Sequence, residues 1–460
     1  MPLMEAELAT CSYDKMRLRV IGVGDKDLPF EPNNFEECFR QLVTGWMEHI
    51  PRLCQGANGW PKPQTIHLDV VCGGLVIEET KKIVGPECKA LVWWSSALAS
   101  MPAYLTEYDF TAIAREIFSD EKKRNGRSID DILLQATLAW NGRDKLTGAV
   151  VKFPGAPNMY DHERTAYGAG PPEGFAPILL SAHALAKAAD GYIVPTSACF
   201  EPIAVPYCRE LYKRSRQELF TVGMQTRALC GQDFVPVALT NEVLKSFLGN
   251  AVESYGPNSV LYISFGSLFF PTATPQLIEA LLNTLLNLVK PFPFVLALGG
   301  KLAALPKELI QRVNSTGKGL ICDFWVEQRP ILQHAAVGWF LTHGGFNSIS
   351  ESLAEGVPLI IWPVGGEQPV NAALLSSGPD PVAFELLQIR TGPQLGPSLR
   401  GGPKITGTVE DAAEEFRATF EAARGAKGAI LSANAIKLAG ALRESAAGEA
   451  SEEIIRSTKL

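Results

Sequence analysis

A regular alternation of apolar and amphipathic segments between residues 260 and 364 constrains the fold of this chain more than any other feature. Strand-like runs such as VLYISFGS and VGWFLTHGG alternate with helix-like runs such as TPQLIEALLNTLLNLVK and NSISESLAEG. Short apolar runs separated by helical periodicity predict β–α–β units, which build a parallel sheet with helices on both faces. We therefore predict a doubly wound α/β domain in this part of the chain.

The predicted strands end in five short segments rich in glycine and polar residues, namely SFGS, LGGK, CDFW, THGG and WPVGGEQ. The carboxyl ends of parallel strands lie at one edge of a sheet, and doubly wound folds bind their ligands there. We therefore expect the five segments to converge on one crevice.

The 460 residues are too many for one ordinary core, so we expect two domains. Before residue 230, the strand-like runs RLRVIGVG, TIHLDVVCGG, ALVWWSS and YIVPTS, with helical patterns between them, indicate another α/β region. Residues 102–174 interrupt it and resemble a helical and loop insert. The predicted parts are a first Rossmann-like domain at 1–230, a linker at 231–255, a second Rossmann-like domain at 256–440 and a C-terminal tail or helix at 441–460.

The composition argues against several classes of protein. A formal net charge of -7 disfavours a nucleic-acid surface, which needs clustered Lys and Arg. The sequence contains no run of about 18 apolar residues, the length that a transmembrane helix needs, and its first residues lack the pattern of a secretory signal. We therefore expect a cytoplasmic protein. The nine cysteines form no CxxC pair and have no neighbouring histidines, which favours reduced thiols over disulfides or a metal site.

The turn THGGFNS at 342–348 is suited to phosphate groups. It joins a strand to a helix, so the backbone N–H groups from Gly345 to Ser348 should be free and lie at the positive end of the helix dipole. The side chains of Asn347 and Ser348 and the ring of His343 add hydrogen-bond donors. The alternative is that Asn347 or Ser348 only caps the helix.

Residues near this turn have the chemistry to recognise a nucleoside. Glu351 lies four residues after Asn347 on the same helix face, where a carboxylate can accept both hydroxyls of a ribose. Trp325 follows the strand GLICDF and offers a flat face to a base, while backbone groups of Val326 and Gln328 would read its edge. The alternatives are a solvated glutamate and a core tryptophan.

Glu367 and Gln368, after PLIIWPV, offer acceptors and an amide donor for the hydroxyls of a sugar. Taken together, residues 325–368 resemble, without a gap, the sugar-nucleotide signature of family 1 UDP-glycosyltransferases in the form known from plants and fungi. The resemblance assigns base stacking to Trp325, phosphate binding to His343, Asn347 and Ser348, ribose binding to Glu351, and sugar binding to Glu367 and Gln368.

Three smaller features extend the resemblance. Phe346 stands where plant members usually have Trp, a residue that contributes its backbone N–H, and Gly344 replaces the usual Cys. The SFGS segment looks like the glycine turn that lies near the diphosphate in this family. Ser267 is the residue that we assign to that turn.

The resemblance implies a fold and an activity. The fold would be GT-B, in which two Rossmann-like doubly wound domains face each other across a cleft. The activity would be an inverting hexosyltransferase that moves sugar from a UDP-sugar to a hydroxyl of a lipophilic small molecule. The UDP-sugar would be the co-substrate, with no other cofactor and no metal, and Gln368 favours UDP-glucose.

The first domain departs from the family pattern. Members begin with a strand, a glycine turn and a His that deprotonates the acceptor, whereas RLRVIGVG looks like the segment after the second helical unit of the family. We therefore expect about 50 to 70 residues, including a central strand, to be missing from an incomplete first domain. The acidic partner of the family's His follows the strand LDVVCGG. Cys72 occupies that position here, and Asp69, three residues earlier, is a weak candidate for the role.

Four histidines, His49, His67, His162 and His183, are conceivable substitutes for the base, but none lies in a matching motif. We expect His67 to be buried and hydrogen-bonded in its strand, and His49 and His183 to lie in helices. The alternative hypothesis is therefore a catalytically impaired UDP- or UDP-sugar-binding homologue, or a truncated gene product. The HGGF segment would also suit an esterase. An esterase would need a GxSxG segment as well, and the chain lacks one.

Overall fold

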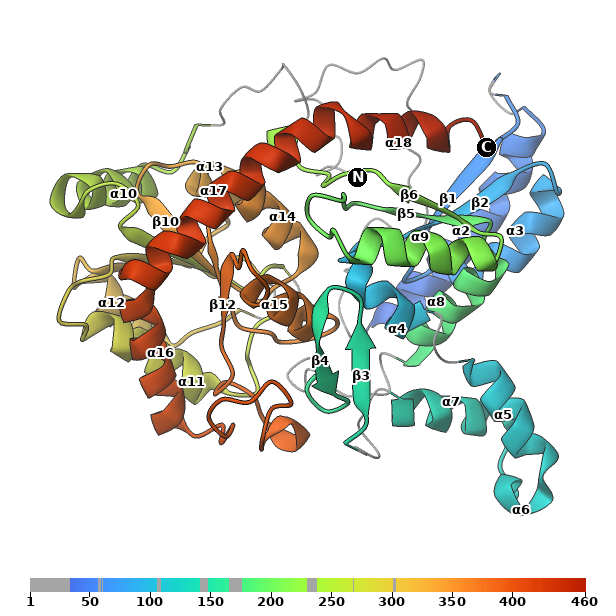
Figure 1. Ribbon diagram of the computed structural model, residues 1–460, viewed down its shortest axis with the longest axis horizontal. Helices are drawn as coiled ribbons and strands as arrows, with labels where there is room; N and C mark the ends of the chain where they lie inside the picture. The colour runs from blue at the N-terminus through green and yellow to red at the C-terminus, as the bar shows by residue number, and fades with distance from the viewer. Residues whose placement is uncertain are drawn as a thin grey trace. The chain divides into compact units, whose positions relative to one another are not determined.

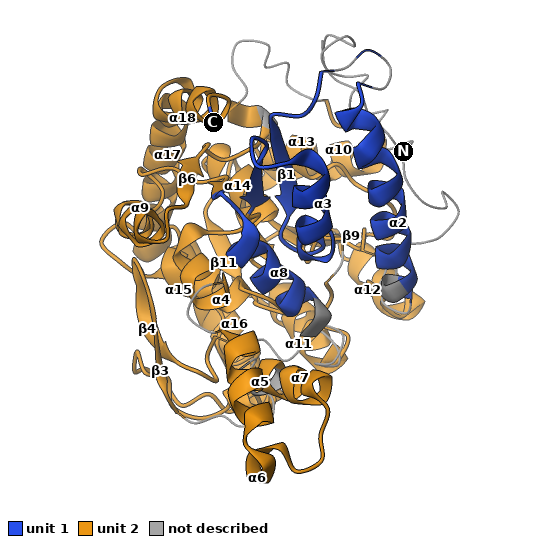
Figure 2. Ribbon diagram, turned by 90° about the vertical axis from the view of Figure 1, so that its right-hand side faces the viewer, with its two compact units in different colours: residues 1–93, 177–191, 460 blue, residues 94–176, 192–459 orange. Residues whose placement is uncertain are grey.

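The computed structural model describes residues 34–56, 59, 61–105, 109–140, 148–164, 176–229, 238–267, 269–300 and 303–460. The chain divides into two compact units, one of residues 1–93, 177–191 and 460 and one of residues 94–176 and 192–459 (Figure 2). The strand expected in RLRVIGVG lies outside the described residues. The bounds of the four predicted parts stay predictions, and the C-terminal part of the expected linker is helical.

The first unit contains two parallel strands. β1 (Thr65–Asp69) pairs with β2 (Lys89–Trp93) along its whole length. The other elements of this unit are α2 (Phe35–Cys54), η3 (Gly73–Leu75), α3 (Ile77–Val84) and α8 (Ala176–Ala188). Trp46 Nε1 donates to Thr80 Oγ1 at 2.8 Å, and Lys81 Nζ donates to Ala188 O at 2.7 Å, so α2 and α8 are both tied to α3. The predicted strand–helix–strand order is confirmed.

The second unit is built on a six-stranded parallel sheet with the order β12-β11-β10-β7-β8-β9, of which Figure 1 labels β10 and β12. Its strands are β7 (Val260–Ser264), β8 (Phe294–Ala297), β9 (Gly319–Cys322), β10 (Val337–Thr342), β11 (Leu359–Ile361) and β12 (Ala383–Glu385). The sheet grows in one direction from β7 to β9 and in the other from β10 to β12. The predicted doubly wound domain is confirmed, and β12 is an addition to the prediction.

Helices cover both faces of this sheet. They are α10 (Glu242–Tyr255), α11 (Pro275–Leu286), α12 (Lys307–Asn314), α13 (Gln328–Leu332), α14 (Phe346–Ala354), α15 (Gln368–Ser376), α16 (Val409–Ala423) and α17 (Ala426–Ala447). Neighbouring strand residues such as Tyr262 and Ile263 point to opposite faces and belong to different apolar clusters. The cluster of Tyr262 includes residues of α10, α13, α14, α15 and α17. The cluster of Ile263 includes residues of α11, α12 and α16. Because neither face contacts water, the strands read as continuous apolar runs.

The rest of the second unit contains both helices and short strands. Its elements are η4 (Leu98–Ser100), α4 (Met101–Leu105), α5 (Phe110–Ser119), α6 (Glu121–Arg124), α7 (Ile129–Trp140), β3 (Val150–Phe153), β4 (Ala156–Tyr160), β5 (Gly191–Val194), α9 (Ala204–Arg214), β6 (Glu218–Thr221), η6 (Arg227–Leu229), η8 (Gly392–Gln394) and α18 (Glu449–Ser457). β3 and β4 form an antiparallel hairpin, so the expected helical and loop insert is wrong at 150–160. Gly155, at φ +85°, turns this hairpin, and the proline- and glycine-rich FPGAPN therefore reads as a loop. The expected C-terminal helix is confirmed by α18.

Candidate functional site

The segments that follow β7, β8, β9 and β10 lie at the carboxyl edge of the sheet. Ser264 at the end of β7 pairs with both Thr342 of β10 and Ala297 of β8, and Ala297 pairs with Cys322 of β9, so the four strands end level. The order in which successive strands are added to the sheet reverses between β7 and β10. Sheets of this type bind their ligands at that position. The SFGS and THGG turns flank that position.

His343 belongs to the THGG turn and is 8% exposed, and its ring lies between Gly266 of the SFGS turn and Gly345. A Cβ atom on Gly266 would come within 2.8 Å of His343 Cε1, and one on Gly345 within 2.3 Å of Nε2, so only glycine at both positions leaves room for the ring. Thr342 Oγ1 lies 3.3 Å from His343 Nδ1. Burial lowers the pKa of His343 to about 4, so the ring is neutral at pH 7 and keeps one N–H donor.

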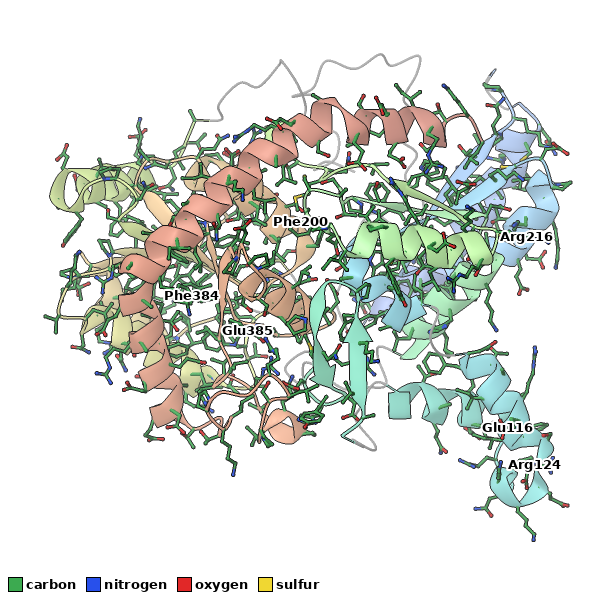
Figure 3. The ribbon with its side chains drawn as sticks, in the orientation of Figure 1. Glu116, Arg124, Phe200, Arg216, Phe384 and Glu385 are labelled. Atoms are coloured by element: carbon green, nitrogen blue, oxygen red, sulfur yellow. The ribbon has the colours of Figure 1, made fainter. Side chains whose placement is uncertain are left out.

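Helix α14 has an open N-terminus. Its N-cap is Gly345 and no side chain caps it, so the alternative that Asn347 or Ser348 is the cap is wrong. The backbone N–H groups of Phe346, Asn347 and Ser348 open the helix and have no acceptor within it. The ring of Phe346 is buried and packs edge-on against that of Phe200, which is labelled in Figure 3, with ring centroids 6.1 Å apart. Free N–H groups at the positive end of a helix dipole can bind an anion.

Glu351 lies further along α14 and is half-buried. Gln328 Nε2 donates to Glu351 Oε2 at 2.8 Å and lies 3.4 Å from Ser348 Oγ. The side chain of Gln328 therefore orients Glu351, a contact that the sequence did not indicate. Burial raises the pKa of Glu351 above its ordinary value.

Trp325 is 72% exposed, so the alternative of a core tryptophan is wrong. Its indole lies so close to the turn after β8 that a Cβ atom added to Gly299 would be 3.3 Å from Trp325 Cε3. Val326 is buried in the core, whereas Ser267 is exposed in the turn after β7. An exposed indole at this edge offers a stacking face of the kind that a base requires.

Gln368 begins helix α15 and is 2% exposed. Its Oε1 accepts hydrogen bonds from Val364 N and Gly365 N, both at 2.8 Å, so this oxygen holds the loop before the helix. Glu367 is half-buried, and burial raises the pKa of its carboxyl group. Asn371, which was not predicted from the sequence, donates from Nδ2 to Gly344 O at 3.0 Å and lies 3.5 Å from Glu367 Oε1. Asn371 lies one helical turn after Glu367, and this spacing was the signal in the sequence that could have indicated their contact.

The acid–base candidates of the first unit do not form a pair in the described part of the chain. His67 lies in β1 with its side chain exposed, so the expectation of a buried His67 is wrong, because Ile66 and Leu68 occupy the buried face. Asp69 shares the exposed face, and its Oδ1 accepts from the backbone N–H of Val71 at 2.8 Å.

The other candidates differ in their surroundings. Burial raises the pKa of Cys72 to about 11, so this side chain is a neutral thiol at pH 7. His49 lies in α2 with Nδ1 2.8 Å from Gly45 O, and His183 is buried in α8. His162 stacks on Tyr160, and its Nδ1 is 3.6 Å from an oxygen of Asp161.

Within the described ranges, no group of three or more His, Cys, Asp and Glu side chains is placed to hold a metal ion. The same residues include no helix with the length and apolar character needed to cross a membrane. The described cysteines are free thiols, at positions 38, 54, 72, 88, 199, 208 and 322.

Comparison with solved structures gives the fold. The crystal structure of UDP-glucose: anthocyanidin 3-O-glucosyltransferase in complex with UDP matches with a TM-score of 0.65 and 20% identity, over 99% of this chain and 89% of that one. The structure of Phytolacca americana UGT2 complexed with UDP-2fluoro-glucose and pterostilbene matches with a TM-score of 0.60 and 20% identity, over 91% and 80%. The chain therefore has the GT-B fold.

Over part of its length, the chain is similar in sequence to known glycosyltransferases. UDP-glycosyltransferase eriJ of Hericium erinaceus is 39% identical over 196 residues, which are 42% of this chain and 38% of that protein. (R)-Mandelonitrile beta-glucosyltransferase of Prunus dulcis is 39% identical over 125 residues, or 26% and 25%. The chain thus spans less than two fifths of the length of these relatives. The family model described as UDP-glucoronosyl and UDP-glucosyl transferase matches residues 238–390 of this chain.

Proposed function

We propose that this chain transfers a hexose from a UDP-sugar to a hydroxyl group of a lipophilic small molecule. The observation that carries the proposal is the arrangement around α14, where an open helix N-terminus, the neutral His343, Glu351 and the exposed Trp325 lie at one edge of the sheet. Together they supply donors for a diphosphate, acceptors for a ribose and a face for a base.

The names of relatives support the class of acceptor. (R)-Mandelonitrile beta-glucosyltransferase of Prunus dulcis and abscisate beta-glucosyltransferase of Phaseolus angularis are both named for small organic molecules. Glu367 and Gln368 are the residues that we propose for the sugar, with UDP-glucose as the donor and no further cofactor. We also propose a cytoplasmic location.

In the proposed reaction, the acceptor oxygen attacks the anomeric carbon of the sugar. The bond from this carbon to the β-phosphate oxygen breaks, UDP departs with the electron pair, and the configuration inverts. The N–H groups that open α14 and the N–H of His343 stabilise the charge on the departing diphosphate. The hydroxyl proton of the acceptor passes to a general base, and no described residue is assigned to that role.

The proposal is tested by calorimetric titration with UDP and UDP-glucose, together with an assay of UDP release in the presence of phenolic and sterol acceptors. We expect both ligands to bind and UDP to be released only when an acceptor is present. Binding without release across the acceptor panel would contradict transfer and leave a donor-binding protein. Absence of binding by a folded chain, judged by circular dichroism, would contradict the donor site itself.

A further inference from the structure

Helix α4 contributes to the same apolar cluster as helix α15, at whose start Glu367 and Gln368 lie. Ala103 of α4 shares a buried apolar cluster with Val370 and Ala373 of α15 and with Phe153 and Met159 of the β3–β4 hairpin. All of these residues belong to the second unit. The proposed sugar residues are therefore supported by a segment outside the six-stranded sheet.

Tyr104, the residue after Ala103, reaches the loop between β11 and α15. Its hydroxyl donates to the backbone carbonyl of Gly366 at 3.3 Å, directly before Glu367. Burial raises the pKa of Tyr104 to about 12, while the side chain of Arg164, hydrogen-bonded to this hydroxyl, opposes the rise. The phenol is therefore protonated, and able to donate, throughout the neutral pH range.

The segments that carry Tyr104 and its partner Arg164 are themselves held by hydrogen bonds. The buried Glu201 accepts hydrogen bonds from Leu98 N at 2.8 Å and Ala99 N at 2.7 Å, which anchors the turn that leads into α4. The buried Glu163 precedes Arg164 and accepts from Tyr160 N at 2.8 Å and Leu399 N at 3.0 Å. Tyr104 is thus a fixed partner for the loop rather than a free surface group.

The loop is consequently held from two sides. Gln368 Oε1 binds the N–H groups of Val364 and Gly365 from within the loop, and Tyr104 binds the carbonyl of Gly366 from α4. The groups proposed for the base, the ribose and the diphosphate lie on other segments, at 267, 325–328 and 343 and in α14. A change at Tyr104 should therefore act on the sugar and leave the UDP moiety unaffected.

We propose that Tyr104 is a positioning residue for the donor sugar, because its hydroxyl fixes the loop that presents Glu367 and Gln368. The proposal rests on the function proposed above and deepens it, since it assigns part of the sugar subsite to helix α4. Tyr104 acts through the loop and is not assigned a direct role in the reaction.

The test compares the affinities of Tyr104→Phe for UDP and for UDP-glucose by calorimetry. Loss of one hydrogen bond should weaken UDP-glucose binding about fivefold and leave UDP binding within about twofold of the wild type. The KM for UDP-glucose should rise by a similar factor, with the KM for the acceptor unchanged. Tyr207→Phe is the matched control, because Tyr207 is an exposed tyrosine on α9.

Each other outcome overturns the inference. Equal weakening of UDP and UDP-glucose would mean that Tyr104 serves the fold in general. Unchanged affinity for both ligands would mean that the hydroxyl does not position the loop. If the wild-type chain binds neither ligand, the proposed function fails, and the inference fails with it. Binding of both ligands by the wild type separates failure of the inference alone from failure of the function.

Discussion

The carboxyl edge of the six-stranded sheet and the strand β1 of the first unit differ in how they place polar residues. At the sheet edge, His343, Glu351 and Gln328 come from different segments and make specific contacts at 2.8 to 3.4 Å. On β1, His67 and Asp69 are two residues apart on one exposed face, and no hydrogen bond or ion pair joins them in the described part of the chain.

The difference comes from topology. In a parallel sheet that grows in both directions from its centre, the strand ends meet at one edge, and polar residues in the following turns are forced together. Along a single strand, successive side chains point to opposite faces, so residues two positions apart lie on the same side in any pleated strand. Neighbours at the sheet edge therefore suggest a site more strongly than neighbours on β1.

Substitution of Glu351 should have the largest effect on this comparison. Glu351→Ala removes the acceptor proposed for two ribose hydroxyls, and charged hydrogen bonds contribute about 1.5 to 3 kcal/mol each. We expect the Kd for UDP to rise by at least about 100-fold, which corresponds to about 3 kcal/mol. Calorimetric titration measures the change.

The matched control is Glu308→Ala, on the exposed face of α12, which should leave the Kd for UDP unchanged. If Glu351→Ala binds UDP as tightly as the wild type, Glu351 is only a partner of Gln328. In that case the contacts at the sheet edge would be structural, and the contrast with β1 would disappear.

Substitution of Trp325 should have the next largest effect. Stacking of a base on an aromatic ring contributes about 1 to 3 kcal/mol, so Trp325→Ala should weaken UDP binding about 10- to 100-fold. Because the indole is 72% exposed, the free energy of unfolding should change little. Trp325→Phe keeps a ring and should recover most of the affinity. Equal affinity of the Ala and Phe variants would exclude stacking.

The topology of the sheet also explains how much could be predicted from the sequence. The alternation of strands and helices from 260 to 364 predicted the sheet, and the turns that follow its strands indicated where His343 and Glu351 would lie. The hairpin β3–β4 was not predicted, because its strands are four and five residues long and are separated by a Pro-Gly turn. The contact between Tyr104 and Gly366 joins residues 262 positions apart, and no local pattern encodes such a pairing.

The buried His343 should make stability depend on pH. Its folded pKa of about 4 lies below its ordinary value of 6.5, so between these values the unfolded chain binds a proton that the folded chain does not. Stability from this group is therefore present above pH 6.5 and is lost as the pH falls towards 4. We expect His343 to account for a loss of about 2 kcal/mol in unfolding free energy from pH 7.5 to 5.

This loss is measured by urea denaturation of the wild type and His343→Gln at both pH values. The groups that titrate elsewhere are common to the two proteins, so the difference between their pH dependences isolates position 343. We expect the variant to lose about 2 kcal/mol less than the wild type over this range. Identical pH dependences would show that His343 accepts a proton in the folded chain, and the ring would then lack the protected setting described for the sheet edge.

Substitution of Asp69 should have the smallest effect and tests the comparison from its other side. The Asp69 carboxylate accepts the N–H of Val71 at 2.8 Å, so its role in the structure is to close a turn after β1. Asp69→Ala should cost about 1 kcal/mol of stability, whereas Asp69→Asn keeps an oxygen acceptor and should cost less. If the turn is its whole role, turnover by Asp69→Asn should fall less than about threefold, while loss of a general acid–base partner would cost about 100-fold or more. A large fall in turnover with unchanged UDP affinity would therefore make β1 a catalytic element, and proximity along a single strand would then be as informative as convergence at the sheet edge.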